Sequence, residues 1–168
     1  MKLKKFFSLL LVAALFVGFT SCSDDDDDIT VPSQVSGTWK FNNDITPIVT
    51  SSSSDVQAAT QLILAGLVGE AGLPPFTITF NTDNTCVLTP TGGDPENGTY
   101  TYTNGKLVVS GDLSLLVLAG GAPSISFDVT LVSGNLVLEL DMKPILGAMI
   151  DIEGVTKLAI AIKFNPAN

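Results

Sequence analysis

Residues 125–141, ISFDVTLVSGNLVLELD, decide the fold of this chain. Apolar and polar side chains alternate on both sides of Ser133-Gly134-Asn135, which is a turn sequence. A period of two is typical of β-strands that bury one face. The segment therefore predicts two antiparallel strands joined in a hairpin.

The same alternation recurs through most of the chain. Asn104-Gly105 is a strong hairpin sequence, because both residues readily take the positive φ angles of a type I′ turn. Closing a meander of such strands buries the apolar face and removes exposed edges. The prediction is a mainly β fold, an antiparallel meander that closes into a β-barrel or half-barrel. Its seven or eight short strands include segments at 37–42, 76–80, 85–89, 100–103, 107–110 and 157–164.

One helix is expected after the first strand, from about Asp55 to Gly69. Ser54 and Gln57 have the spacing of a capping box. Apolar side chains then recur at helical spacing, which predicts that they share a face: Val56, Ala59, Ile63 and Leu67.

Periodicity does not resolve two apolar stretches. Residues 113–119 are compatible with a buried strand or a short helix. Residues 144–152 are predicted to form a short helix near the C-terminus, with Pro144 at its first position. The alternative for this second stretch is an apolar loop over one end of the sheet.

The N-terminus has the composition of a secretion signal. Lys2, Lys4 and Lys5 precede an apolar run at 6–19, and small polar residues separate this run from Cys22. A bilayer-spanning helix needs roughly 20 apolar residues, and this run is shorter. We therefore expect a signal peptide at 1–21, a tether at 22–35 and one folded domain at 36–168.

Phe19-Thr20-Ser21-Cys22 resembles the bacterial lipobox. The resemblance implies that Cys22 is acylated and anchors the protein to a membrane, since two or three acyl chains hold a protein stably there. The acidic run after it resembles the export signal of Bacteroidetes-type surface lipoproteins, which implies display on the exterior of the outer membrane. Considered alone, the run is only a solvated spacer. The residues that resemble the export signal are Ser23, Asp24, Asp25, Asp26, Asp27 and Asp28.

Charge and composition exclude several functions. The chain has 17 acidic residues against 8 basic ones, all lysine, and no His. This balance argues against a nucleic-acid partner. The absence of His and Arg, of a Gly-rich phosphate loop and of a clustered metal-ligand motif argues against an enzyme, a metal and a cofactor. Cys86 is the only Cys beyond Cys22, so we expect it to pack in the core rather than act as a nucleophile.

Gly37-Thr38-Trp39, at the start of the first strand, resembles the opening motif of lipocalins. The chain as a whole resembles the lipocalin-like domains of secreted lipoproteins from gut Bacteroidetes. The resemblance of the Gly-x-Trp triplet to the lipocalin motif implies a barrel in which Trp39 packs across the closed end. From the residue alone, Trp39 forms either the floor of a ligand cavity or simply part of the core.

Other candidate sites have equally plain structural explanations. Tyr100 and Tyr102 are candidates for stacking on a small apolar ligand or a sugar ring, or they are buried. Paired carboxylates can cleave a glycoside, but solvated charge on the outer face is the expected role of Asp128, Glu139 and Asp141. The loop Asp94-Pro95-Glu96-Asn97 offers oxygens for calcium without the spacing of a dedicated loop.

Two functions follow for a non-catalytic lipoprotein domain. In the first, the barrel binds a small apolar or amphipathic ligand. In the second, bulky side chains fill the barrel and its outer surface contacts another outer-membrane protein or a glycan. The large residues expected to point inward weaken the first hypothesis, because they fill a small barrel: Phe76, Phe80, Ile125, Phe127, Leu138, Ile160 and Phe164.

Overall fold

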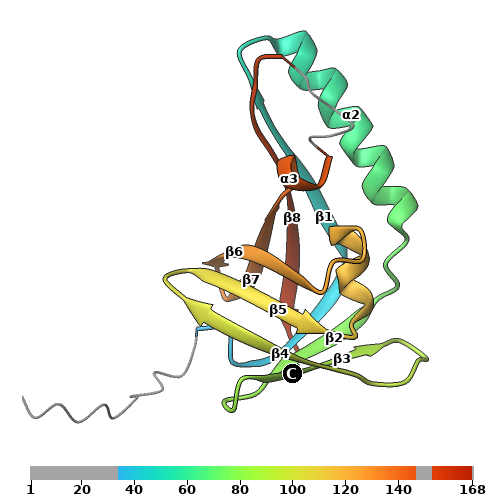
Figure 1. Cartoon of the computed structure of the whole chain (residues 1–168), viewed down its shortest axis with the longest axis vertical. Helices are drawn as coiled ribbons and strands as arrows, with labels where there is room; N and C mark the ends of the chain where they lie inside the picture. The colour runs from blue at the N-terminus through green and yellow to red at the C-terminus, as the bar shows by residue number, and fades with distance from the viewer. Residues whose placement is uncertain (1–33, 147–152, 168) are drawn as a thin grey trace, which may run out of the picture. The chain divides into compact units, whose positions relative to one another are not determined.

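The computed structural model describes residues 34–146 and 153–167 (Figure 1). The predicted signal peptide at 1–21, Cys22, Ser23 and the acidic run at 24–28 lie outside the described residues.

Eight antiparallel strands form a closed barrel in the order of the sequence. This arrangement confirms the predicted closed meander. Neighbouring strands pair all the way round, and the first strand closes the barrel by pairing with both the second and the last. The strands are β1 (Gly37–Ser51), β2 (Phe76–Phe80), β3 (Thr85–Pro90), β4 (Glu96–Thr103), β5 (Lys106–Gly111), β6 (Ser124–Val132), β7 (Asn135–Asp141) and β8 (Val155–Pro166).

β1 continues well past the predicted end of the first strand at Asn42. The segment Asn42-Asn43-Asp44 has the composition of a turn, but it forms an irregularity within a continuous strand. Asn43 takes a φ of 61°, and the register with β8 shifts between Phe41 and Ile45. Three residues of β1 stand here against one residue of β8, and an irregularity of this kind bends a strand and increases its twist without ending it.

Helix α2 (Ser54–Ala71) follows β1 and lies alongside it (Figure 1). The helix was expected at this place, but its cap was predicted one residue too late. The cap is Ser53, whose side chain accepts a hydrogen bond from the Val56 backbone N–H at 3.5 Å. The most buried side chains are Thr60 and Leu64, whereas Ile63 and Leu67, two of the residues expected to share a face, are exposed.

Short helices occur in both apolar stretches whose secondary structure was left open by periodicity. Residues 114–119 form a 3₁₀ helix, η1 (Ser114–Ala119), whose Leu115, Leu116 and Leu118 are buried. The second stretch begins with a single turn, α3 (Lys143–Leu146), so that Pro144 is its second residue. The remaining part of that prediction, residues 147–152, lies outside the described residues.

Large side chains fill the barrel interior. The rings of Phe41, Phe76 and Phe164 meet with centroid separations of 4.9 to 5.8 Å. Phe80 packs edge-on against Tyr100 at 5.0 Å. These five residues and Trp39 are termed the aromatic core below. All seven residues predicted to point inward are buried.

The asparagine-glycine hairpin has the expected geometry. Asn104 and Gly105 have φ angles of 52° and 78°. These values confirm the predicted left-handed conformations and fix the register of β4 against β5.

Candidate functional site

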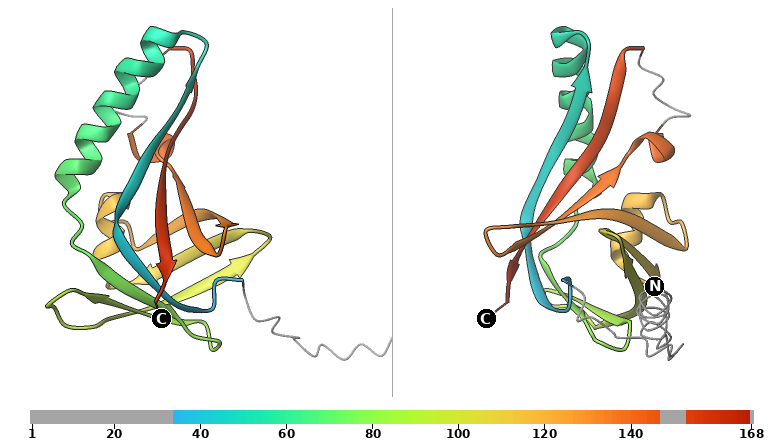
Figure 2. Two further views of the ribbon diagram at one scale, coloured as in Figure 1. Left: turned by 180° about the vertical axis from the view of Figure 1, so that it is seen from behind. Right: turned by 90° about the vertical axis from the view of Figure 1, so that its left-hand side faces the viewer.

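The barrel wall divides where β6 leaves β7. The first half of β6, from Ser124 to Asp128, pairs with β5, and its second half, from Asp128 to Val132, pairs with β7. β7 pairs with β8 along almost its whole length, from Leu136 to Asp141, so beyond Glu139 it has β8 but not β6 as a partner. Figure 2 shows β6 running across the molecule while β7 and α3 rise away from it. This divergence is termed the split.

A groove of about 600 Å³ opens at the split. Its volume lies within the range of small-molecule sites. Apolar side chains form much of its lining, and η1, β6, β7 and α3 each contribute: Ala119, Ala122, Ile125, Leu140, Pro144 and Ile145. Its polar lining comes from Lys106, Ser124, Ser126, Asp128 and Asp141. The groove can therefore hold an apolar body beside a charged or hydrogen-bonding group.

A smaller charged hollow of about 290 Å³ adjoins the groove. Asp128 and Asp141 line both spaces. The smaller hollow also contains Glu139, Lys143 and Lys157. Three of the five lysines beyond residue 21 thus lie around these two hollows: Lys106, Lys143 and Lys157.

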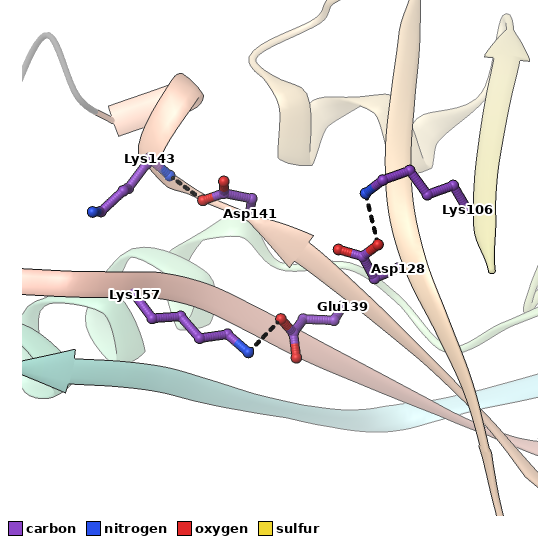
Figure 3. Close-up of polar contacts among 6 residues, drawn as sticks. All are labelled: Lys106, Asp128, Glu139, Asp141, Lys143 and Lys157. Carbon is purple, nitrogen blue, oxygen red and sulfur yellow. Dashed lines mark hydrogen bonds and ion pairs between the residues drawn. The ribbon is translucent and has the colours of Figure 1, made fainter. Parts of the chain in front are cut away.

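Two of the three carboxylates around the split form ion pairs (Figure 3). Lys106 Nζ lies 2.7 Å from Asp128 Oδ1, and Lys157 Nζ lies 2.7 Å from Glu139 Oε1. Asp141 Oδ1 instead accepts a hydrogen bond from the Lys143 backbone N–H at 2.9 Å. The structure brings together the three carboxylates expected on the outer faces of these strands, with Asp128 opposite Glu139 in register.

Trp39 lies in the aromatic core. Its side chain is buried, with 9% of the residue's surface exposed. The indole Nε1–H donates a hydrogen bond of 2.8 Å to the carbonyl of Val35. The groove at the split has no Trp39 in its lining.

The two tyrosines occupy different environments on β4. Tyr100 is buried, and its hydroxyl donates to the carbonyl of Asn81 at 2.7 Å. Tyr102 is half-buried, and its hydroxyl donates to Gln34 Oε1 at 3.3 Å. Only Tyr102 therefore keeps a partly accessible ring on this strand.

The acidic loop before β4 is not a cluster of free oxygens. Glu96 and Asn97 belong to β4 itself. Glu96 Oε2 accepts a hydrogen bond of 2.6 Å from the backbone N–H of Ser114, at the start of η1. Within the described residues, no three acidic or Cys side chains lie together as metal ligands would.

Cys86 is fully buried on β3. Burial raises the pKa of its thiol to about 11, which keeps the sulfur protonated and unreactive at neutral pH. Its side chain faces Gly98 on the neighbouring strand.

Helix α2 leaves large apolar side chains on the surface. Leu62 is 76% exposed, Ile63 49% and Leu67 41%. Between the helix and β1 is a crevice of about 300 Å³, lined in part by Phe41, Ile45 and Val68. The exposed face and the crevice lie on a different element from the groove.

The groove was not anticipated from the sequence. Alternation places Ile125 and Leu140 inward, but it does not show that their two strands separate at Asp128. The sequence signal that could have revealed the separation is the unequal length of β6 and β7 on either side of their hairpin. The longer strand must extend past its partner.

No family model matches the chain, and no curated protein matches it. Among the described residues, no helix combines the length and hydropathy needed to cross a bilayer. The function is therefore argued from the site itself.

Proposed function

We propose that the chain is a surface lipoprotein whose non-catalytic barrel domain binds a small amphipathic ligand in the groove at the split. The observation that carries this proposal is the groove itself, about 600 Å³ in volume, with apolar and charged groups side by side. The aromatic core meanwhile occupies the barrel interior. The proposed site is thus at the split rather than above Trp39.

A binding role agrees with the way in which the local charges are held. Asp128 and Glu139 each have a lysine at 2.7 Å. The proposed role of these pairs is to fix the sides of the groove.

Lipid anchoring is proposed from Cys22 and the segment before it. Cys22→Ala should release the protein from membranes or block its processing, and Ser23→Ala is the matched control that keeps the acylation site. Membrane fractionation and the mobility of the mature protein measure the outcome. A Cys22→Ala form that fractionates and migrates like the wild type would show that Cys22 is not the anchor.

Surface display is proposed from the acidic run at 24–28. Replacing all five aspartates with Ala should leave the anchor intact but keep the protein on the inner side of the outer membrane. Protease accessibility on whole cells measures this change. Equal accessibility of both forms would show that the run is only a spacer.

Ligand binding is tested by an unbiased mass-spectrometric search for small molecules that co-purify with the folded, non-acylated protein. We expect an amphipathic compound that is lost when Ile145→Gln makes the groove lining polar. Retention of the same compound by this variant would place its site elsewhere.

The second candidate is an interaction module, which the exposed apolar face of α2 favours. If a partner protein covers this face, Leu62→Gln should abolish a chemical cross-link between the two proteins on whole cells. The stability of the isolated domain should not fall, because Leu62 is 76% exposed. A cross-link that survives Leu62→Gln would exclude this face as the contact.

A further inference from the structure

We infer that the groove at the split takes an amphipathic cation, an apolar molecule bearing a protonated amine, whose N–H groups are held by Asp141. This inference rests on the proposed function and names its ligand class. It depends on which charges around the split are already paired, on the groove lining and on the charge of the whole chain.

Asp141 is the carboxylate at the split that retains acceptor capacity for a ligand. Lys106 and Lys157 pair with Asp128 and Glu139 respectively. Asp141 forms no ion pair with any described residue, and one hydrogen bond from the Lys143 backbone N–H occupies part of Oδ1. A carboxylate has about four lone-pair sites, so most of its accepting capacity is unused.

The ammonium group of Lys143, two residues along the chain, forms no ion pair with Asp141. Lys143 Nζ donates to the carbonyl of Thr156 on β8 at 3.0 Å. Lys143 also lies outside the lining of the larger groove. The charged side chains in that lining are Lys106, Asp128 and Asp141, which leaves an excess of one negative charge.

The apolar lining determines the other half of the ligand. Ile125 and Leu140 are inward-facing strand residues, and Ile145 approaches from α3. A short alkyl or alicyclic body on these side chains would leave its polar end near Asp141, because Asp141 lines the same groove.

The lining also separates kinds of cation. Quaternary ammonium groups have no N–H and are recognised by aromatic side chains. No aromatic side chain of the described residues lines this groove. A carboxylate with unused acceptor sites instead favours a primary or secondary amine, which forms a charge-assisted hydrogen bond.

The charge of the chain acts in the same direction. Beyond residue 21 the chain has five lysines and 17 acidic residues, and Arg and His are absent from the whole chain. A strongly negative surface attracts cations and repels anions at long range. An alkyl carboxylate would therefore meet repulsion and find no Arg to hold it.

The test compares four probes of matched chain length by isothermal titration of the non-acylated protein: decylamine, decyltrimethylammonium, decanoate and decanol. We expect decylamine to bind about tenfold or more tightly than the other three at pH 7, since a hydrogen bond between charged groups adds to the same apolar contact. Its affinity should fall as salt is added.

Two isosteric variants assign the effect to Asp141. Asp141→Asn keeps an acceptor for the Lys143 N–H, so the fold is preserved, and should weaken decylamine binding about tenfold or more while leaving decanol unchanged. Asp94→Asn removes the same charge from an exposed loop outside the groove lining and should change affinity less than about twofold.

The outcomes distinguish this inference from the proposed function. If decanoate or decanol binds as tightly as decylamine or more tightly, and Ile145→Gln abolishes that binding, the ligand is not a cation but the groove remains a ligand site. Equal effects of Asp141→Asn and Asp94→Asn would overturn the role of Asp141. Failure of all four probes to bind would overturn both the inference and the groove as an amphiphile site.

Discussion

In the aromatic core, paired strands direct large rings into a shared interior, whereas at the split two strands of equally regular alternation separate and leave a groove. Phe41, on β1, lies opposite Phe76 and Phe164 on the two neighbouring strands. Ile125 and Leu140 also point inward, but their strands are no longer hydrogen-bonded to one another beyond Asp128 and Glu139. Hydrophobic alternation therefore determines which face of a strand is buried, and the pairing of neighbouring strands determines whether the space behind that face is filled.

The largest effect is expected in the aromatic core. Trp39→Ala removes a side chain that is almost completely buried and should lower the free energy of unfolding by about 3 to 5 kcal/mol. Urea titration measures the change, and Trp39→Phe is the milder control that keeps an aromatic ring. A loss below about 1 kcal/mol would mean that the core around Trp39 is already hollow and that the comparison fails.

A smaller effect is expected where β3, β4 and β5 meet closely. A Cβ atom at Gly98 would lie 2.6 Å from the Ser110 carbonyl oxygen and 2.8 Å from Leu113 Cδ1. Gly98→Ala should therefore cost about 1 to 3 kcal/mol of stability by overpacking.

The matched control for Gly98 is Gly66, which lies within α2 with no neighbouring atom within 4 Å of an added Cβ. Gly66→Ala should stabilise the protein by about 0.5 to 1 kcal/mol, because alanine is the better helix former. Equal effects of the two substitutions in denaturant titrations would contradict the close packing at Gly98.

The buried thiol predicts a dependence on alkaline pH. Burial raises the pKa of Cys86 from an ordinary value of 9.0 to about 11. The group is protonated in both states below pH 9, so its contribution to stability is complete there and is lost as the pH rises through about 11. Above pH 9, the free energy of unfolding of the wild type should therefore fall relative to that of Cys86→Ala.

Thiol labelling gives a second readout of Cys86. A pKa raised by two units leaves about 100-fold less thiolate at pH 8. Site-resolved mass spectrometry should therefore find slow alkylation of Cys86 in the folded protein and rapid alkylation in urea. Equally fast labelling in both states would show that this wall of the barrel opens readily.

The smallest change in stability is expected at the split. Ala122→Leu adds bulk to a half-buried residue in the groove lining and should alter stability by no more than about 0.5 kcal/mol. It should still weaken decylamine binding, because the added side chain occupies the groove. Ala58→Leu, on the exposed surface of α2, is the control that should change neither quantity. A large loss of stability from Ala122→Leu would show that the split is packed like the core.

Several local features were predictable because short-range chemistry decides them. The turn at Asn104-Gly105 has the expected positive φ angles, and the strands have the expected period of two. The bulge in β1 was not predictable in the same way. Asn42-Asn43-Asp44 has turn composition, and pairing with β8 on both sides of it keeps the strand continuous.

The buried face of α2 shows a different limit. Apolar side chains occur on every side of the segment, interspersed with polar ones such as Gln57, Thr60 and Gln61. No side of such a helix stands out as the one to bury, and contact with β1 selects Thr60 and Leu64. Ile63 and Leu67 are as apolar as Leu64 but are exposed.

Periodicity and turn chemistry are local properties, so the antiparallel meander, the helix after the first strand and the bulky residues of the interior follow from the order of the residues. The sequence also carries the charge balance and the segment around Cys22 from which anchoring is proposed. Only the tertiary structure decided where β6 and β7 separate and which carboxylate at the split has no lysine. Those features depend on the register between strands and on side chains distant in sequence, such as Lys106 and Asp128, meeting in space.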